Sequence, residues 1–239
     1  MPDNLPAIEF PAAIVDLKYP LMRLRQASEG KGVVRIVAMG SSSTAGRADV
    51  VPYPYRLEMY LRQYFRDVLH RTDIRIDVLN RGIGGQEATE ELGRFETDIF
   101  PDDPALVIWQ VGTNAVFHND QYDVDVVAGD IRKGLAQLRA RGFEVLLMDP
   151  QYTTKMLWDD RANLSDRMVR LIREAANEAG VSLFQRWALM RHWHVQNNVS
   201  FEQMVDTSDP DKLHQNDWST MQVSLALKDA MIAAAGLTA

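Results

Sequence analysis

A run of hydroxyl side chains, GSSSTAG at residues 40–46, directly follows the apolar segment VVRIVAM at 33–39. A serine hydroxyl becomes a nucleophile when a neighbouring base takes its proton, and an imidazole can be that base near neutral pH. The chain places one at His214, straight after the segment DPDKL. A serine, a histidine and nearby carboxylates are the parts of nucleophilic acyl transfer.

Two further positions offer hydrogen-bond donors for a developing oxyanion. Gly85, in NRGIGG, lets a backbone N–H approach a substrate oxygen with no side chain in the way, and Asn114, in GTN, can donate a side-chain N–H to the same oxygen. Loss of one such donor typically raises the barrier by about 2.7–4 kcal/mol. The imidazole also needs a partner on its second nitrogen, and both Asp209 and Asp211 lie within reach.

The elements that must position these residues alternate along the chain. Apolar or alternating runs predict strands at 33–39, 73–80, 105–112, 143–149 and 181–184. Helical spacing of apolar residues predicts helices at 21–27, 55–70, 86–100, 124–142, 164–180 and 217–236. Gly142 and Asn216 are expected to cap two of them.

Strands that alternate with helices predict an α/β fold with a parallel sheet covered on both faces. In such folds functional residues gather at the carboxyl ends of the strands, which is where the candidate segments lie. No linker rich in Pro, Gly or Ser divides the chain. We therefore expect an N-terminal arm at 1–32 and a single catalytic domain at 33–239.

Four segments, taken in order, resemble the sequence blocks of the SGNH hydrolase superfamily, also called GDSL-type esterases and lipases. IVAMGSSSTAG is similar to the first block, VLNRGIGGQEA to the second, VIWQVGTNAV to the third and DKLHQNDWS to the fifth. The resemblance implies a three-layer α/β/α sandwich with a mostly parallel, five-stranded, flavodoxin-like sheet. It also implies hydrolysis of esters or thioesters with no metal or organic cofactor, and some relatives transfer acyl groups instead.

The same resemblance assigns roles to individual residues. Ser42 takes the place of the nucleophile, His214 that of the base, and Asp211 that of the acid that orients the base. The backbone N–H of Ser42, together with Gly85 and Asn114, would form the oxyanion hole. Asp211 is preferred over its competitor because it matches the Asp-x-x-His block.

Two positions depart from the family pattern. Ser41 stands where an Asp usually precedes the nucleophile, and Ala115 stands where an Asp usually follows the oxyanion Asn. Neither is a core catalytic group in the resemblance. We expect activity to survive, with altered hydrogen bonding around the site.

The composition limits which binding partners and which cellular compartments are expected. The chain has 239 residues, a net charge of −7 and no cysteine, which disfavours nucleic acid and excludes disulfides and thiolate chemistry. No apolar run approaches the ~20 residues that span a bilayer, and the N-terminus lacks the pattern of a signal peptide. The sequence leaves the compartment open: we expect a cytoplasmic protein as the sequence stands, or a periplasmic or secreted one if a signal peptide has been removed. The sequence carries no signal for the oligomeric state.

Two motifs invite other chemistry. The serine-rich turn is not followed by the Gly-Lys-Ser/Thr of a phosphate-binding loop, which disfavours a flavodoxin-like nucleotide binder. His192 and His194, in RHWH, face apart on a helix and have no carboxylate cluster with them. We therefore expect no metal site.

Two segments, 149–160 and 186–211, are expected to select the substrate, because loops at this edge of a sheet carry specificity. Their flat aromatic side chains with polar neighbours suit sugars, and their methionines suit acyl chains. We expect Tyr152, Trp158 and Trp193 to contact the substrate. The alternative is a small hydrophobic subcore under long loops.

These residues together predict a serine esterase or deacylase that hydrolyses carboxylic esters through an acyl-enzyme, with acetyl or another short acyl group on a carbohydrate favoured. The same residues would also serve an acyltransferase or a hydrolase of lipid esters or thioesters. A protein of this fold that binds a glycan or a partner protein without turnover is a further alternative. It is disfavoured because all five catalytic groups are present.

Overall fold

The computed structural model describes residues 7–158 and 161–238. One sheet of five parallel strands runs through it in the order β2-β1-β3-β4-β5. The strands are β1 (Gly32–Gly40), β2 (Ile74–Gly82), β3 (Leu106–Gln110), β4 (Val145–Met148) and β5 (Ser182–Phe184). All five predicted strands are present, and the predicted α/β fold is confirmed.

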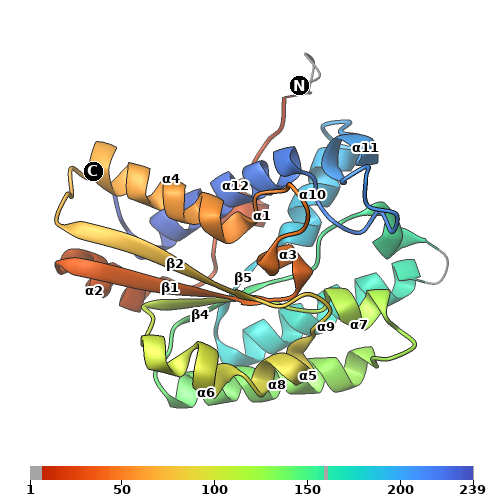
Figure 1. Cartoon of the computed structure of the whole chain (residues 1–239), viewed down its shortest axis with the longest axis horizontal. Helices are drawn as coiled ribbons and strands as arrows, with labels where there is room; N and C mark the ends of the chain where they lie inside the picture. Colours follow the sequence, from red (N-terminus) through yellow and green to blue (C-terminus); the bar gives the residue numbers. More distant parts are fainter. Residues whose placement is uncertain (1–6, 159–160, 239) are drawn as a thin grey trace.

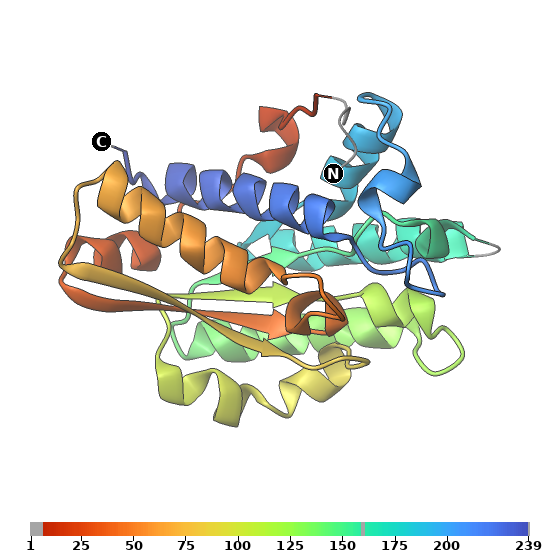
Figure 2. The ribbon, with the colours of Figure 1, turned by 45° about the horizontal axis from the view of Figure 1, so that its top comes forward.

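Helices cover both faces of this sheet (Figure 1). On one face α4 (Tyr53–Asp67) and α12 (Asp217–Ala235) pack side by side, as Figure 2 also shows. On the other face α8 (Val124–Ala140) packs against α9 (Arg161–Ala179). The arrangement is the three-layer sandwich that the sequence predicted.

The helices form where apolar spacing and capping residues agree. In α8, Val127, Ile131 and Leu135 recur at helical spacing and are buried. Gly142 follows the end of α8 with φ +79°, a conformation that favours glycine. The Asn216 side chain accepts a hydrogen bond from the Ser219 amide at 2.9 Å and begins α12. Both predicted caps are confirmed.

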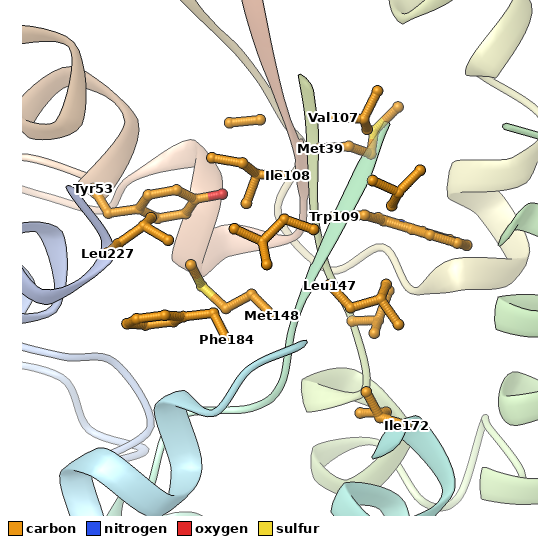
Figure 3. Packing of buried hydrophobic residues seen from close by; sticks show 14 of the residues in the cluster. Met39, Tyr53, Val107, Ile108, Trp109, Leu147, Met148, Ile172, Phe184 and Leu227 are labelled. Atoms are coloured by element: carbon orange, nitrogen blue, oxygen red, sulfur yellow. The ribbon is translucent and has the colours of Figure 1, made fainter. Parts of the chain in front are cut away.

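The core lies on both sides of the central strands. Figure 3 shows side chains of successive residues on opposite faces, as a strand requires. Ile108 and Met148 point toward Tyr53 of α4 and Leu227 of α12, whereas Trp109 points the other way. Because both faces are buried, β3 reads in the sequence as a continuous apolar run.

The shorter elements lie between these layers or after the strands. At the carboxyl end of the sheet are α3 (Ser42–Ala45), α5 (Ala88–Leu92), α7 (Thr113–Phe117) and η2 (Thr154–Leu157). The others are α1 (Ala12–Val15), α2 (Met22–Glu29), α6 (Phe95–Asp98), η1 (Phe100–Asp102), α10 (Arg186–Val195) and α11 (Phe201–Met204). The helix predicted over 86–100 is therefore interrupted, and Gly93 is the residue at which α5 ends.

The N-terminal segment packs on the sandwich. Leu21 and Leu24 are buried in the main core, and the Leu21 amide donates to the Ala234 carbonyl of α12 at 3.0 Å. Among the described residues, no helix combines the length and apolarity that crossing a membrane requires.

Candidate active site

The serine turn follows β1, the strand that lies between β2 and β3 in the sheet. In this strand order the chain connections reverse between β1 and β3, and parallel sheets bind ligands at such a point. Gly40 ends β1 where no side chain fits, because a Cβ there would lie 2.3 Å from the Thr44 hydroxyl and 3.0 Å from Gln110. Ser42 is the first residue of the short helix α3.

Gln110, the last residue of β3, holds the serine turn in place through hydrogen bonds. Its side-chain oxygen accepts hydrogen bonds from the Ser41 amide at 3.3 Å, the Ser41 hydroxyl at 3.1 Å and the Thr44 hydroxyl at 3.4 Å. Ser41 is thus a buried anchor of the turn, in the position where the family usually has Asp. The sequence did not reveal the role of Gln110, which lies 69 positions from Ser41.

The structure brings Ser42 and His214 together, although they are 172 positions apart. The Ser42 Oγ lies 2.9 Å from His214 Nε2. On the other side of the ring, Nδ1 lies 2.7 Å from Asp209 Oδ2. With the Nδ1 proton donated to this carboxylate, Nε2 accepts from the serine hydroxyl, which is the arrangement that activates a nucleophile.

The carboxylate beside His214 is that of Asp209, and the prediction of Asp211 is corrected. The chain curls around Asp209, whose Oδ2 accepts from the backbone amides of Leu213 at 3.1 Å and His214 at 3.0 Å. Asp211 instead points outward, with its side chain 46% exposed and its Oδ1 4.0 Å from Lys155 Nζ. Lys212, with φ +53°, lies in the turn between Asp211 and His214.

Burial opposes the ionisation of Asp209, but hydrogen bonds outweigh it. The ring and the backbone amide of His214 donate to the carboxylate, and Arg47 forms an ion pair with it. Together they hold the pKa of Asp209 well below its usual range. Arg47 Nη1 also lies 2.9 Å from His214 Nδ1. The sequence reasoning missed Arg47, for which no motif provided a signal.

The loop after β2, which carries Gly84 and Gly85, approaches Ser42. A Cβ on the preceding residue, Gly84, would lie 3.8 Å from Ser42 Cβ. Gly85 has φ +81°, a conformation that favours glycine, and open space where its side chain would be. The hydroxyl of Tyr122 donates to the Gly85 carbonyl at 3.3 Å and holds the loop from outside.

Asn114 lies in the first turn of α7, directly after β3. Its Nδ2 donates one hydrogen bond to the Gln86 carbonyl at 2.7 Å, which ties it to the loop that carries Gly85. A carboxamide nitrogen has two hydrogens, so the second remains available to a substrate oxygen. The Asn114 side chain is thereby held in one orientation beside the Gly85 loop.

A buried glutamine, Gln151, forms hydrogen bonds with four other segments around the site. Its Oε1 accepts from the hydroxyls of Ser43 at 3.1 Å and Thr113 at 3.2 Å and from Arg186 Nη2 at 2.9 Å. Its Nε2 donates to the Leu213 carbonyl at 3.2 Å, next to His214. The sequence placed Gln151 in a substrate-selecting loop, and its connecting role was missed.

Two of the three residues predicted to contact the substrate are packed inside the protein. Trp193 is fully buried: its Nε1 donates to the Glu9 carbonyl at 3.0 Å, and Phe10 packs edge-on against its ring. The prediction for Trp193 is therefore corrected, because the N-terminal segment covers it. Tyr152 is 9% exposed and packs against Trp187. The small subcore was the better interpretation of this segment.

Trp158, by contrast, is 46% exposed. The Lys155 ammonium lies 5.5 Å from the Trp158 ring centre and 5.6 Å from that of Phe117, which belongs to the same short helix as Asn114. The Lys155 amide also donates to the Lys212 carbonyl at 3.3 Å. An aromatic face thus lies on the segment next to the His214 loop, and its contact with substrate stays a prediction.

The two histidines of the RHWH motif have separate partners. His192 Nε2 lies 3.2 Å from Glu9 Oε2, and His194 Nδ1 lies 2.8 Å from the Val199 carbonyl. Across residues 7–158 and 161–238, no three His, Cys, Asp or Glu side chains gather in a way that could hold a metal ion.

A small cavity of about 20 Å³ lies beside Ser42 and His214. Arg47, Val50 and Pro52 form part of its wall. A water molecule needs about 10–15 Å³, so the cavity is about the size of one small group.

This geometry agrees with the comparison with known families. A model of the non-GDSL lipase-like family matches residues 7–235. The chain belongs to that family. Membership bears out the predicted resemblance to SGNH-type hydrolases, and with it the prediction of an enzyme that hydrolyses ester bonds.

Similar proteins of this fold include carbohydrate esterases. An acetylxylan esterase, Axe2, from Geobacillus stearothermophilus has a TM-score of 0.64 at 20% identity, over 85% of this chain and 94% of that one. A two-domain esterase (CEX) active on acetylated mannans has a TM-score of 0.73 at 16% identity, over 96% of this chain and 58% of that one. At these identities the likeness establishes the fold.

A likeness in sequence is found with an uncharacterized lipoprotein, YqeF, of Bacillus subtilis (strain 168). The two are 31% identical over 96 residues, which are 40% of this chain and 38% of that protein. The match therefore spans well under half the length of this relative.

Proposed function

We propose that this protein is a serine esterase that removes short acyl groups, such as acetyl, from carbohydrates. The observation that carries the proposal is the chain of contacts from Ser42 Oγ to His214 Nε2, at 2.9 Å, and from Nδ1 to Asp209, at 2.7 Å. The lipase-like family and the fold shared with acetylxylan and acetylmannan esterases support it.

In the first half of the reaction, Ser42 Oγ attacks the ester carbonyl while His214 Nε2 takes the serine proton. Asp209 stabilises the imidazolium that forms, because its buried carboxylate stays ionised. The backbone amides of Ser42 and Gly85 and the Asn114 side chain donate to the oxyanion. The imidazolium then protonates the departing sugar hydroxyl, which leaves an acyl-enzyme.

In the second half, water replaces the sugar. His214 takes a proton from the water, the resulting hydroxide attacks the acyl carbonyl, and the same donors hold the second oxyanion. His214 then returns the proton to Ser42 Oγ, and the free acid departs.

The size and surroundings of the site support short acyl groups on sugars. The small cavity of about 20 Å³ beside Ser42 favours an acetyl methyl group over a long chain. The half-exposed ring of Trp158 provides a flat face near the site on which a sugar could stack.

The test compares the wild type with Ser42→Ala on p-nitrophenyl acetate, butyrate and octanoate, and on acetylated xylo- and manno-oligosaccharides. We expect acetate to be the best of the three simple esters and the oligosaccharides to release acetic acid. Ser42→Ala should lose activity by at least about 10³-fold.

Three outcomes would contradict the proposal. Equal activity in both proteins would remove Ser42 from the mechanism. Faster hydrolysis of octanoate than of acetate would replace the short-acyl assignment with a lipid ester. Transfer of acetyl to an added sugar, without release of acid, would identify a transferase.

A further inference from the structure

One buried carboxylate joins the two loops that carry the oxyanion donors. Glu87 follows Gly85 by two residues and is 2% exposed. Its Oε1 accepts from the Gly112 amide at 2.8 Å, and its Oε2 accepts from the Ala115 amide at 3.0 Å. These two amides flank Asn114 in the turn after β3. The contacts therefore cross from the second sequence block to the third.

Glu87 is also fixed within its own loop. Its Oε1 accepts from the Ala88 amide at 3.0 Å, and its backbone N–H donates to Glu90 Oε2 at 2.9 Å, which completes a capping box at the start of α5. The carboxylate thus cannot shift toward one loop without losing contacts to the other.

The Glu87 carboxylate also caps the N-terminus of α7, which has no capping side chain of its own. The residue before α7, Gly112, has no side chain to cap the helix, and Ala115 has no polar side chain. Glu87 reaches across to accept the free amides at the start of α7. The opposite contact, from Asn114 Nδ2 to the Gln86 carbonyl at 2.7 Å, closes the link between the loops.

We infer that Glu87 is a positioning residue of the oxyanion hole. It sets the separation between the Gly85 amide and the Asn114 carboxamide, so that both donors meet one substrate oxygen. The inference rests on the proposed function, since it concerns the transition state of ester hydrolysis. Glu87 touches no reacting atom and acts through the two loops.

The chain contains a matched control in Glu91, one turn further along α5. Glu91 is also a fully buried carboxylate, but its Oε2 accepts from Trp109 Nε1 at 2.6 Å, inside the core. Burial raises the pKa of both Glu87 and Glu91. A change at Glu91 therefore reproduces the loss of a buried carboxyl without touching the oxyanion loops.

The experiment compares Glu87→Gln with Glu91→Gln. In Glu87→Gln the new NH₂ group faces an N–H of the Gly112 or Ala115 amide, so one loop contact becomes a repulsion. We expect kcat on p-nitrophenyl acetate to fall about ten- to hundredfold, less than the full loss of one oxyanion donor, with KM changed by less than about twofold. Glu91→Gln should keep the wild-type kcat.

A second readout separates this role from simple loss of structure. In the thionoester analogue of the substrate the carbonyl oxygen is replaced by sulfur, which accepts hydrogen bonds weakly. Glu87→Gln should therefore slow the thionoester by less than about threefold while it slows the ester tenfold or more. A general loosening of the fold would slow both substrates equally and would overturn the inference.

The double variant Glu87→Gln/Asn114→Ala tests the route through Asn114. If Glu87 acts by placing Asn114, the double variant should be slower than Asn114→Ala alone by less than about threefold. Fully multiplied losses would overturn this route. Where Glu87→Gln does not fold, Glu87→Asp, which keeps the charge but reaches less far, carries the same comparison.

Ser42→Ala keeps the two proposals distinguishable. An inactive Ser42→Ala beside a Glu87→Gln with wild-type kcat overturns the positioning role alone. An active Ser42→Ala overturns the esterase mechanism, and the positioning role with it.

Discussion

At the scale of single residues, the most heavily bonded group of the site is the Asp209 carboxylate. Two backbone amides and the His214 ring donate to its Oδ2, while the Asp211 amide, at 3.2 Å, and Arg47 donate to its Oδ1. The carboxylate is therefore held in one orientation while it stays charged. A base partner of this kind fixes the tautomer in which Nε2 can accept the serine proton.

The two neighbouring aspartates provide the first prediction. Asp209→Asn keeps the shape but places an NH₂ group or a neutral oxygen against Nδ1, which favours the wrong tautomer, so kcat should fall toward the about 10⁴-fold loss seen when a triad loses this charge. Asp211→Asn changes an exposed side chain and should keep kcat within about twofold. Steady-state kinetics on p-nitrophenyl acetate measure both. A dead Asp211→Asn beside an active Asp209→Asn would restore the assignment made from the sequence block.

This pair also shows where sequence reasoning reaches its limit at the residue scale. Spacing offered two carboxylates within reach of one imidazole. The direction of each side chain depends on the turn that includes Lys212. The positive φ of Lys212 is not indicated by any sequence motif. Ser42, His214, Gly85 and Asn114 were found because each lies in a block at a strand end, where topology alone brings residues together.

At the scale of the elements, α8 packs closely on the sheet because Gly134 has no side chain at the contact. A Cβ on Gly134 would lie 2.3 Å from the Trp109 ring and 2.8 Å from Leu92. Glycine in a helix interior costs about 1 kcal/mol relative to alanine. Here the close approach of the indole explains its presence, and Gly129, in the same helix, has open space around it.

The two glycines therefore predict opposite effects of the same substitution. Gly134→Ala should lower the melting temperature by about 2–6 °C, because overpacking costs about 1–3 kcal/mol or more and exceeds the gain in helix propensity. Gly129→Ala should raise it by about 1–3 °C. Thermal unfolding followed by circular dichroism measures both. A rise in both variants would mean that Trp109 moves aside without strain.

The elements that the sequence failed to predict share one physical cause. The local periodicity of apolar residues indicates strands and long helices, and the sequence predicted these elements well. The helix α10 begins within a segment interpreted as a loop, and its Trp193 is buried only because Phe10 and Glu9 lie across it. Gln151 likewise has partners 108 and 62 positions away. Contacts at such separations leave no periodic signal in either segment.

At the scale of the whole molecule, one buried acid at the end of β4 links stability to pH. Asp149 is fully buried, its Oδ1 accepts from the Trp187 amide at 2.8 Å, and its Oδ2 has no hydrogen-bond partner among the described residues. Burial raises its pKa from 3.8 to about 7, against the lowering effects of the Trp187 amide and Arg186. The folded protein thus keeps this proton after the unfolded chain has released it.

A raised pKa contributes stability that is complete below pH 3.8 and is lost as the pH rises to about 7. Asp149→Asn removes this dependence because the amide is neutral throughout. The free energy of unfolding of Asp149→Asn, relative to the wild type, should therefore increase from pH 4 to 7 and then level off, by at most about 1.4 kcal/mol per pH unit. Urea unfolding at several pH values measures it.

The control for this experiment is Asp211→Asn, which removes the same formal charge from an exposed position. Its stability relative to the wild type should stay nearly constant over the same pH range. A flat difference for Asp149→Asn would show that Asp149 is ionised in the folded protein throughout and that Arg186 compensates its charge.

The contacts of Gln151 also bear on when a newly made chain becomes active. Its partners Ser43, Thr113 and Leu213 follow β1, β3 and β5, so they leave the ribosome at different times. A nascent chain that ends after β4 carries the nucleophile but no base. Closing loops between distant segments is the slow part of folding, so catalytic competence comes at the end of biogenesis. Until then the incomplete chain lacks the contact between Ser42 and His214 on which the proposed reaction depends.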